Sequence, residues 1–359
     1  MNWNVKMINR LALLSCAPFI GMLIWIVATG GLMLELSDRA FPEPSSQRPP
    51  EHLTHTAMLS QRLDDAQATA VVTADKLKES TRLYSQTNKD MKSIVQTVTT
   101  QAARPAKIYD RRITIKLGTP SSTVQSDKLR AQLFHIKAQN FNGYALKVKL
   151  KAEDAMKMVL GNDKFGGAET TLSATQRYKA LAGVNAGGFA DQGGERYPLS
   201  TTVLDGEYVN GFEASFKDLF FVGVNKDLKL VGGNYSSKTE LDNEQAMFGA
   251  SFVPILLKNG YRQTIPLKWQ TSPKRTARTV VANYKDDQLL FIVTDGANNS
   301  GASGATLAEM QTLLIRFGAV DAYNLDGGGS SSLIFNGRVV NNPKDGQLRK
   351  LSTHFLFFK

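Results

Sequence analysis

Residues 322–332 read AYNLDGGGSSS, and the interpretation of the C-terminal half of the chain starts from this stretch. An apolar run ends at Asp326, and three glycines and then three serines follow it. Glycine loses more backbone entropy on folding than any other residue, so three in a row indicate a place where unusual backbone geometry or a close approach is required. Successive backbone N–H groups in such a run can form an anion-binding nest. We therefore expect a binding site at Asp326.

The sequence on both sides of this stretch predicts hairpins and one well-marked helix. Residues 278–294 form a predicted hairpin with a turn at 285–287. Thr306 and Glu309 make a capping box that starts a helix, and Gly318 is placed to end it. Further strands are predicted at 111–117, 145–150 (with its lysines outward), 220–224, 319–325, 332–335 and 338–341. Hairpins outnumber strand-helix-strand units, so the predicted fold class is α+β, with a mixed, largely antiparallel sheet and packed helices.

A second aspartate-glycine pair ends another predicted strand. Asp295 and Gly296 close the second strand of the hairpin, just as Asp326 closes the strand before the glycine run. If these two strands are neighbours and run the same way, two carboxylates meet at one edge, which is a geometry for acid or base chemistry. The alternative is that both pairs are ordinary Asp-Gly turns at strand ends.

The first 36 residues predict a cytoplasmic tip and a transmembrane anchor. Residues 11–34 are almost entirely apolar and long enough to cross a hydrocarbon core of about 30 Å. Lys6 and Arg10 precede this run, while Glu35 and Asp38 follow it, so the rest of the chain is expected outside the cytoplasm, in the periplasm or beyond the cell. A signal peptide cleaved near residues 28–30 is the alternative.

A proline-rich linker at 37–51 and a helical stalk at 52–104 are predicted to precede a domain at 105–359. The stalk carries apolar residues with a period of seven, as in a coiled coil, so the chain is expected to form a homo-oligomer through it. The seam comprises Leu63, Ala70, Leu77, Tyr84, Met91 and Val98, with Leu59, Ala66 and Ile94 beside them and weak points at Thr73, Ser80 and Thr87. The alternative is a single amphipathic helix that lies on the domain or on a partner.

Composition narrows the classes of partner and cofactor. The chain has 359 residues, 42% of them hydrophobic, and a net charge of +11, which describes a globular protein that favours anionic surroundings. No nucleic-acid-binding motif accompanies the basic residues, so nucleic acid is not an expected partner. The single cysteine, Cys16, excludes a disulfide within the chain. The four histidines are scattered, so neither a metal site nor any cofactor is predicted.

Residues 278–341 resemble the phosphodiester glycosidase family. The family pattern of an Arg-Thr strand, a strand that ends in Asp-Gly and an Asn-Leu-Asp-Gly-Gly-Gly-Ser element is met at 278–279, 295–296 and 324–330. Upstream, residues 184–189 resemble the family's Asn-Gly-Gly-Phe-Phe motif, and the resemblance extends over residues 140–359. Ala186 and Gly188 stand where the family prefers Gly and Phe, so a stacking aromatic is missing there; Ala282 replaces a glycine.

The resemblance implies a hydrolase that cleaves a sugar-1-phosphodiester in an envelope glycan or exopolysaccharide. A carboxylate would act at the sugar, and positive charge or N–H donors would hold the phosphate. The predicted catalytic residues are Asp326, Asp295 and Arg278, the last as a phosphate clamp. The predicted substrate-binding residues are Asn185, Gly187, Gly327, Gly328, Gly329, Ser330, Ser331 and Arg275. The alternative function is a non-catalytic module that binds glycan or phosphate within an envelope-polysaccharide assembly.

Overall fold

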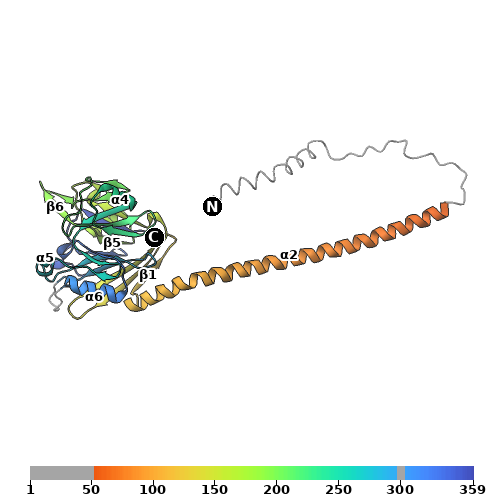
Figure 1. Ribbon diagram of the computed structural model, residues 1–359, viewed down its shortest axis with the longest axis horizontal. Coiled ribbons are helices and arrows are strands. Elements are labelled where there is room, and N and C mark those ends of the chain that lie inside the picture. Colours follow the sequence, from red (N-terminus) through yellow and green to blue (C-terminus); the bar gives the residue numbers. More distant parts are fainter. Residues whose placement is uncertain (1–51, 297–303) are drawn as a thin grey trace. The chain divides into compact units, whose positions relative to one another are not determined.

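The computed structural model describes residues 52–296 and 304–359 (Figure 1). The chain divides into two units, residues 1–94 and residues 95–359. The helix α2 (His52–Leu117) is 66 residues long and supplies all that is described of the first unit. The predicted membrane anchor and the proline-rich linker lie outside the described residues. Within the two described segments, no helix combines the length and the apolar character that crossing a membrane needs.

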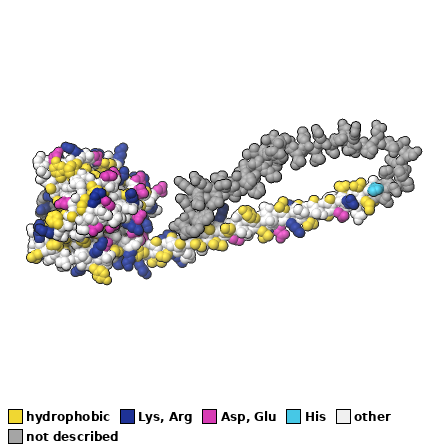
Figure 2. Space-filling model, turned by 45° about the horizontal axis from the view of Figure 1, so that its top comes forward, with side chains coloured by type: hydrophobic (Ala, Val, Ile, Leu, Met, Phe, Trp, Pro, Cys, Tyr) yellow, Lys and Arg dark blue, Asp and Glu magenta, His cyan; other side chains and the backbone are white. Residues whose placement is uncertain are grey.

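The part of α2 in the first unit exposes a row of apolar side chains, seen as yellow along the helix in Figure 2. Leu63, Leu77 and Tyr84 of the predicted seam are 68%, 69% and 71% exposed. An isolated helix gains little stability from propensity alone, and most helices are stabilised by packing of their apolar face. Among the described residues of the first unit, no other element covers this face of α2.

The predicted strand at 111–117 is wrong, because these residues form the last turns of α2. Ile113 and Leu117 are four residues apart and both are buried, which is the spacing of one helix face. Alternation of apolar and polar residues over so short a run did not distinguish a strand from a helix end that packs on a sheet.

A strand was predicted at 145–150 with its lysines outward. The outward orientation is wrong for Lys147. Lys147 Nζ is buried and donates to Asp110 Oδ1 at 2.7 Å and to Thr114 Oγ1 at 2.8 Å. Arg130 and Gln288 also donate to the Asp110 carboxylate, at 2.8 Å and 3.0 Å. This cluster fixes the end of α2 against the sheet within the second unit.

The second unit is built from antiparallel sheets. The largest sheet has eight strands, and every neighbouring pair is antiparallel. Its order is β1 (Ser122–Gln125), β2 (Leu129–Lys137), β3 (Asn142–Leu150), β16 (Leu289–Thr294), β15 (Thr279–Asn283), β17 (Ala322–Leu325), β13 (Ile255–Lys258) and β14 (Tyr261–Arg262).

The remaining strands of the described residues form two five-stranded sheets and one hairpin. The first has the order β11 (Leu230–Gly233), β10 (Phe220–Asn225), β12 (Ala246–Phe252), β8 (Val203–Leu204), β9 (Glu207–Tyr208). The second has the order β19 (Arg338–Val339), β18 (Leu333–Phe335), β5 (Ala182–Asn185), β20 (Thr353–Phe357), β4 (Met156–Leu160), and β6 (Phe189–Gln192) pairs with β7 (Glu195–Pro198). The predicted α+β class with a largely antiparallel sheet is confirmed.

Short helices connect these strands. They are α3 (Thr171–Arg177), α4 (Lys238–Asn243), α5 (Leu267–Thr271), α6 (Leu307–Phe317), η2 (Glu153–Ala155), η3 (Gly161–Asp163), η4 (Gly328–Ser330) and η5 (Lys344–Gly346). The capping box predicted for α6 is confirmed: Thr306 and Glu309 bond each other's backbone, and Gly318 ends the helix at a φ of 83°. A left-handed residue at this position suits glycine.

Two apolar clusters lie on the two faces of the eight-stranded sheet, as the period of two along each strand requires. Val281 and Phe291 face one cluster with Phe355 of β20, so the sheet that contains β5 packs on this face. Val280 and Ile292 face the other cluster, which α6 and the end of α2 cover. The sheet edge at the ends of β16 and β17 carries the candidate site.

Candidate active site

Asp326 and Asp295 follow two strands that run in the same direction. Asp326 comes directly after β17 and Asp295 directly after β16, and both strands pair antiparallel with β15 between them. Of the two conditions set for the carboxylates to meet, the common direction is fulfilled and the direct neighbourhood is not, although the strand ends reach the same edge. Neighbouring strands lie about 4.8 Å apart, so the two aspartate backbones are separated by roughly 10 Å.

Asp326 is held by its backbone and leaves one carboxylate oxygen without a partner. Its backbone carbonyl accepts a hydrogen bond of 2.6 Å from Asn185 Nδ2, and its N–H donates to Ala186 O at 3.3 Å. Asp326 Oδ2 is buried and has no hydrogen-bond partner among the described residues. Burial raises the pKa of Asp326 to about 6, while a hydrogen bond from Ser330 and the charges of Arg349 and Arg196 limit this rise.

Asn185 is completely buried, and both the oxygen and the nitrogen of its amide bond to the protein. Besides the bond to Asp326, Asn185 Oδ1 accepts from Thr279 Oγ1 at 2.8 Å and from the N–H of Ser332 at 3.0 Å. The Thr279 hydroxyl also lies 3.2 Å from Ser331 Oγ. Asn185 thus joins the ends of β5, β15 and β17 and positions the loop that carries the catalytic candidate.

The glycine loop forms the short helix η4, and its own geometry explains the glycines. Gly328 has a φ of 61°, a left-handed conformation, and a Cβ on Gly327 would lie 3.0 Å from Ala277 O. The N–H groups of Gly328, Ser330 and Ser331 donate to Ala277 O, Gly327 O and Gly328 O. Three N–H groups of the predicted nest therefore stabilise the loop itself.

Arg349 is a site residue that the sequence reasoning missed. Its guanidinium packs against Gly329, where a Cβ would lie 2.4 Å from Arg349 Nη2, and Nη1 donates to Ser330 Oγ at 3.3 Å. Arg349 lies far from the glycine run in sequence, and no motif marked it. Only the fold brings it to the loop.

Arg196 is the second missed cation near Asp326. It forms a two-point pair with Asp191, at 2.7 Å and 2.9 Å, and stacks on the ring of Phe189 at 4.0 Å. Arg196, Asp191 and Lys350 line a cleft of about 590 Å³ together with Gly166, Ala168, Gly194 and Glu195. The two cations whose charges act on Asp326 thus come from the β6–β7 hairpin and from the segment before β20.

Arg278, the predicted phosphate clamp, is buried at the start of β15. Its Nε donates to Ala305 O at 3.1 Å and its Nη2 to Pro273 O at 2.8 Å. No carboxylate among the described residues pairs with it, and burial lowers its pKa to about 10. Arg275 donates to Gly304 O at 2.9 Å and pairs with Glu309 at 2.5 Å, so it fixes the start of α6.

Asp295 is anchored to the loop after β19. Its Oδ1 accepts from the N–H of Asn342 at 2.7 Å, and its own N–H donates to Asn142 O at 2.9 Å. Burial and the negative charge of Asp295 raise the pKa of Tyr144. The structure thus places Asp295 at the predicted edge, beside a tyrosine that sequence reasoning did not identify.

The glycines at 187 and 188 are required by packing. A Cβ on Gly187 would lie 2.5 Å from Ala250 Cβ, and a Cβ on Gly188 would lie 2.7 Å from Phe252 Cδ2. Phe252, at the end of β12, therefore occupies the space beside the position where the family pattern has an aromatic residue.

A buried histidine lies behind the site. His354 is opposite Asn185 in the β5–β20 pair, and its Nδ1 lies 3.1 Å from Thr171 Oγ1, which is 2.7 Å from Ser332 Oγ. Burial lowers the pKa of His354 to about 4, so its ring is neutral at physiological pH. Within residues 52–296 and 304–359, no cluster of three or more His, Cys, Asp or Glu residues is arranged to hold a metal ion.

The fold and the site define an α+β protein with two aspartates at one sheet edge and arginines around one of them. The phosphodiester glycosidase family model matches residues 178–358, half of the chain. The chain therefore belongs to the phosphodiester glycosidase family, a class of hydrolases, and the resemblance seen in the motifs is confirmed.

Individual relatives match smaller parts. The SPbeta prophage-derived uncharacterized protein YomE of Bacillus subtilis (strain 168) is 27% identical over 181 residues, 50% of this chain and 28% of that protein. N-acetylglucosamine-1-phosphodiester alpha-N-acetylglucosaminidase of Homo sapiens is 30% identical over 137 residues, 34% of this chain and 26% of that protein. The matches thus span about a quarter of the length of these relatives.

The fold has counterparts among solved structures. The catalytic domain of zebrafish N-acetylglucosamine-1-phosphodiester alpha-N-acetylglucosaminidase, auto-inhibited by its pro-peptide, matches with a TM-score of 0.54 at 19% identity. The match covers 67% of this chain and 87% of that domain. At this identity the likeness establishes the shared fold alone.

Proposed function

We propose that this chain is a membrane-anchored extracytoplasmic glycosidase that hydrolyses a sugar-1-phosphodiester in an envelope glycan or exopolysaccharide. The observation that carries the proposal is the environment of Asp326. Asp326 follows β17, and one of its carboxylate oxygens is buried without a hydrogen-bond partner among the described residues. The positive charges of Arg349 and Arg196 lower the pKa of this carboxylate. Membership of the phosphodiester glycosidase family supports the reaction class.

In the proposed reaction, the bond between the sugar C1 and the phosphate oxygen breaks and its electron pair leaves with the phosphate. The oxygen of a water adds to C1, and one proton of that water is released. Asp326 acts either as the base that takes this proton or as a nucleophile that forms a glycosyl ester, which water then cleaves. Both routes need the ionised carboxylate, and a pKa of about 6 leaves it mostly ionised at neutral pH.

The phosphate needs nearby positive charge, because charge-assisted hydrogen bonds from arginine stabilise phosphate oxygens. Arg349 is exposed, and its only described hydrogen bond goes to Ser330 Oγ. A guanidinium has five N–H donors, so most of those on Arg349 are free for a substrate. Arg278 lacks a carboxylate partner in the described part of the chain, and a bound anion would offset the cost of burying its charge.

The other predicted residues receive supporting roles in this proposal. Asp295 is the second carboxylate of the edge, and Gly187 allows the β5 loop to pack closely. Asn185 is a positioning residue, because its amide is buried and bonds Asp326 O, Thr279 and Ser332. The loop of Gly327, Gly328 and Gly329, with Ser330 and Ser331, presents the Asp326 carboxylate, while Arg275 fixes the start of α6.

The test uses the full chain with the methyl ester of N-acetylglucosamine-1-phosphate and with UDP-N-acetylglucosamine. Release of free reducing sugar is measured for the wild type, for Asp326→Asn and for the exposed control Asp127→Asn. We expect release by the wild type and the control, and a loss on the order of 10³-fold in Asp326→Asn. Saturable binding without release, unchanged in Asp326→Asn, would favour the alternative of a non-catalytic module that binds glycan or phosphate.

The proposed location rests on the apolar run at 11–34 and the charges around it. We expect the full chain to fractionate with membranes and to resist extraction by carbonate. Protease added to intact spheroplasts should digest the domain at 105–359, because that domain lies outside the cytoplasm. Protection of the domain until the membrane is permeabilised would contradict this orientation.

We also propose that two copies of the chain pair through α2. The support is the exposed row at Leu63, Leu77 and Tyr84, which repeats every seven residues. Leu77→Glu should convert a dimer into a monomer in sedimentation velocity of the full chain, because it puts a charge into the seam. Lys89→Glu, two positions before the seam residue Met91, is the control and should leave the dimer intact.

A further inference from the structure

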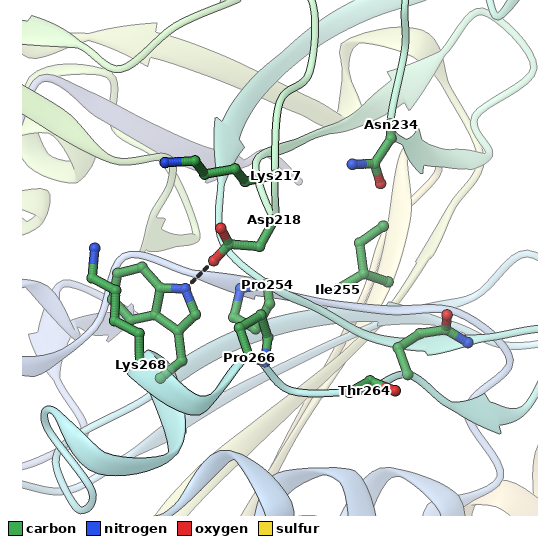
Figure 3. A pocket seen from close by; sticks show the side chains of 10 residues that line it. Lys217, Asp218, Asn234, Pro254, Ile255, Thr264, Pro266 and Lys268 are labelled. Carbon is green, nitrogen blue, oxygen red and sulfur yellow. Dashed lines mark hydrogen bonds between the residues drawn. The ribbon is translucent and has the colours of Figure 1, made fainter.

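A second cavity lies beside the strand that carries Asp326. Its volume is about 620 Å³, within the range of small-molecule sites (Figure 3). It is lined by Lys217, Asp218, Asn234, Pro254, Ile255, Gln263, Thr264, Pro266, Lys268 and Trp269. None of these residues belongs to the catalytic constellation described above, so the cavity needs its own explanation.

The floor of this cavity is tied to the catalytic edge. Ile255 is the first residue of β13, which pairs with β17, and Pro254 directly precedes it. The N–H of Asn324 donates to Pro254 O at 3.3 Å, and Asn324 Nδ2 donates to Val253 O at 2.6 Å. Asn324 is two residues before Asp326. Given the rise along a strand and the spacing between strands, the backbones of Pro254 and Asp326 lie roughly 8 Å apart.

The walls combine an aromatic surface with polar groups. The indole Nε1 of Trp269 donates to Asp218 Oδ2, the dashed bond in Figure 3, so the ring is held in one orientation. Thr264 and Asn234 add a hydroxyl and an amide on the other side of the cavity (Figure 3). A sugar ring has apolar C–H faces and a rim of hydroxyls, and an aromatic wall with convergent polar side chains matches both.

The charge of the cavity favours an acidic ligand. Lys217 and Lys268 are exposed, and neither forms an ion pair with a carboxylate among the described residues. Lys268 Nζ lies 4.7 Å from the centre of the Trp269 ring, so one ammonium is positioned beside the aromatic wall. The one carboxylate of the lining, Asp218, is used by Trp269. Two ammonium groups that lack a carboxylate partner among the described residues therefore belong to the lining of the cavity and give it a net positive charge.

We infer that this cavity binds the acidic oligosaccharide chain of the substrate while the phosphodiester lies at Asp326. The identity of this ligand rests on the proposed function, whereas binding to the cavity can be measured without turnover. The role of the cavity is to hold successive sugar units next to the cleaved one. Chain length and acidity of the glycan would then determine the affinity.

Binding is tested with acidic tetrasaccharides from hyaluronan, alginate and polygalacturonate, and with the neutral chitotetraose. Trp269 reports binding by fluorescence, because the other two tryptophans, Trp3 and Trp25, precede residue 52. We expect saturable fluorescence change with at least one acidic chain and a tenfold or greater loss of affinity in the double variant Lys217→Ala, Lys268→Ala, about 1.4 kcal/mol. The exposed Lys229→Ala is the matched control and should bind like the wild type.

Three outcomes would overturn the inference: no binding of any acidic chain, equal binding of chitotetraose, or equal weakening by Lys229→Ala. The variant Trp269→Phe keeps an aromatic ring but cannot bond Asp218, so it should weaken binding, as measured by calorimetry, without unfolding the protein. Release of sugar from the methyl ester substrate is measured on the same wild-type preparation. Release of sugar without tetrasaccharide binding would refute only the inference that the cavity binds acidic glycan. Tetrasaccharide binding without release of sugar would refute only the proposed function.

Discussion

Arg349 Nη1 donates a hydrogen bond of 3.3 Å to Ser330 Oγ. Ser330 by hydrogen bonding and Arg349 by its charge both lower the pKa of the Asp326 carboxylate. A guanidinium before β20 thus acts on a carboxylate after β17. The positive charge lowers the pKa of Asp326, while burial, the larger influence, raises it. The positive charge favours the ionised carboxylate at neutral pH, and in the proposed function the same cation would bind the phosphate.

Arg349→Ala should lower kcat/KM on the methyl ester substrate by about 10²-fold, the usual effect of removing one donor that stabilises developing charge. Arg349→Lys should recover part of this loss, because the charge remains but the fork of donors is gone. Steady-state kinetics of both variants measure the effect. Arg338→Ala, at an exposed arginine of β19, is the control, and an equal loss in that variant would show that general positive charge explains the result.

The pH dependence of kcat/KM reports the ionisation of the free enzyme. Because Asp326 must be ionised and its pKa is about 6, kcat/KM should rise between pH 5 and pH 7 with a midpoint near 6. In Arg349→Ala the midpoint should move upward, since a charge that lowers this pKa is gone. A rate that instead falls over this range would identify a protonated Asp326 as the active form.

Asp326→Asn should stabilise the protein at neutral pH. The pKa of Asp326 is raised in the folded state, so the folded protein is penalised when the carboxylate ionises, and stability is lost as pH rises through 6. The shift from 3.8 to about 6 corresponds to at most about 3 kcal/mol. Denaturant unfolding at pH 8 and pH 4.5 checks the sign: the gain in Asp326→Asn should be largest at pH 8 and small at pH 4.5.

His354→Asn should flatten the acid side of the stability curve. The pKa of His354 falls from 6.5 to about 4 in the folded state, so the stability that its neutral ring allows is complete above 6.5 and is lost as pH falls towards 4. The change corresponds to about 3 kcal/mol. Urea unfolding from pH 7 to pH 4 measures the slope. His135→Gln, at an exposed histidine, should keep the wild-type slope; equal flattening there would contradict the assignment.

Local patterns predicted the elements around the glycine run well. The hairpin of β15 and β16, the cap at Thr306 and the stop at Gly318 each depend on residues close in sequence. The same is true of the strand before Asp326. Neither the common direction of β16 and β17 nor the strand between them was predicted, because sheet order depends on long-range pairing that a hydrophobic pattern does not encode.

Residues brought together by the fold were harder to predict. Arg349 and Arg196 carry no local motif, and only the contact with Gly329 and the stacking on Phe189 identify them. Arg278 was recognised by its motif, yet its sequence gave no sign that its guanidinium bonds two backbone carbonyls. A lysine in a half-polar strand is expected to face solvent, and Lys147 does not, because the partly buried Asp110 of α2 provides a partner.

The ion pair between the buried Lys147 and the partly buried Asp110 gives the last prediction. Removing one member of a buried ion pair leaves the other charge unsolvated, which typically costs about 3–5 kcal/mol. Asp110→Ala should therefore lower the free energy of unfolding by about this amount, whereas Asp110→Leu combined with Lys147→Met should recover most of the loss. Denaturant unfolding of the full chain measures both. Lys149→Met, at an exposed lysine of the same strand, is the control and should change stability by less than about 0.5 kcal/mol. A double variant as unstable as Asp110→Ala would show that the pair itself, and not the avoidance of an isolated charge, holds the end of α2 to the sheet.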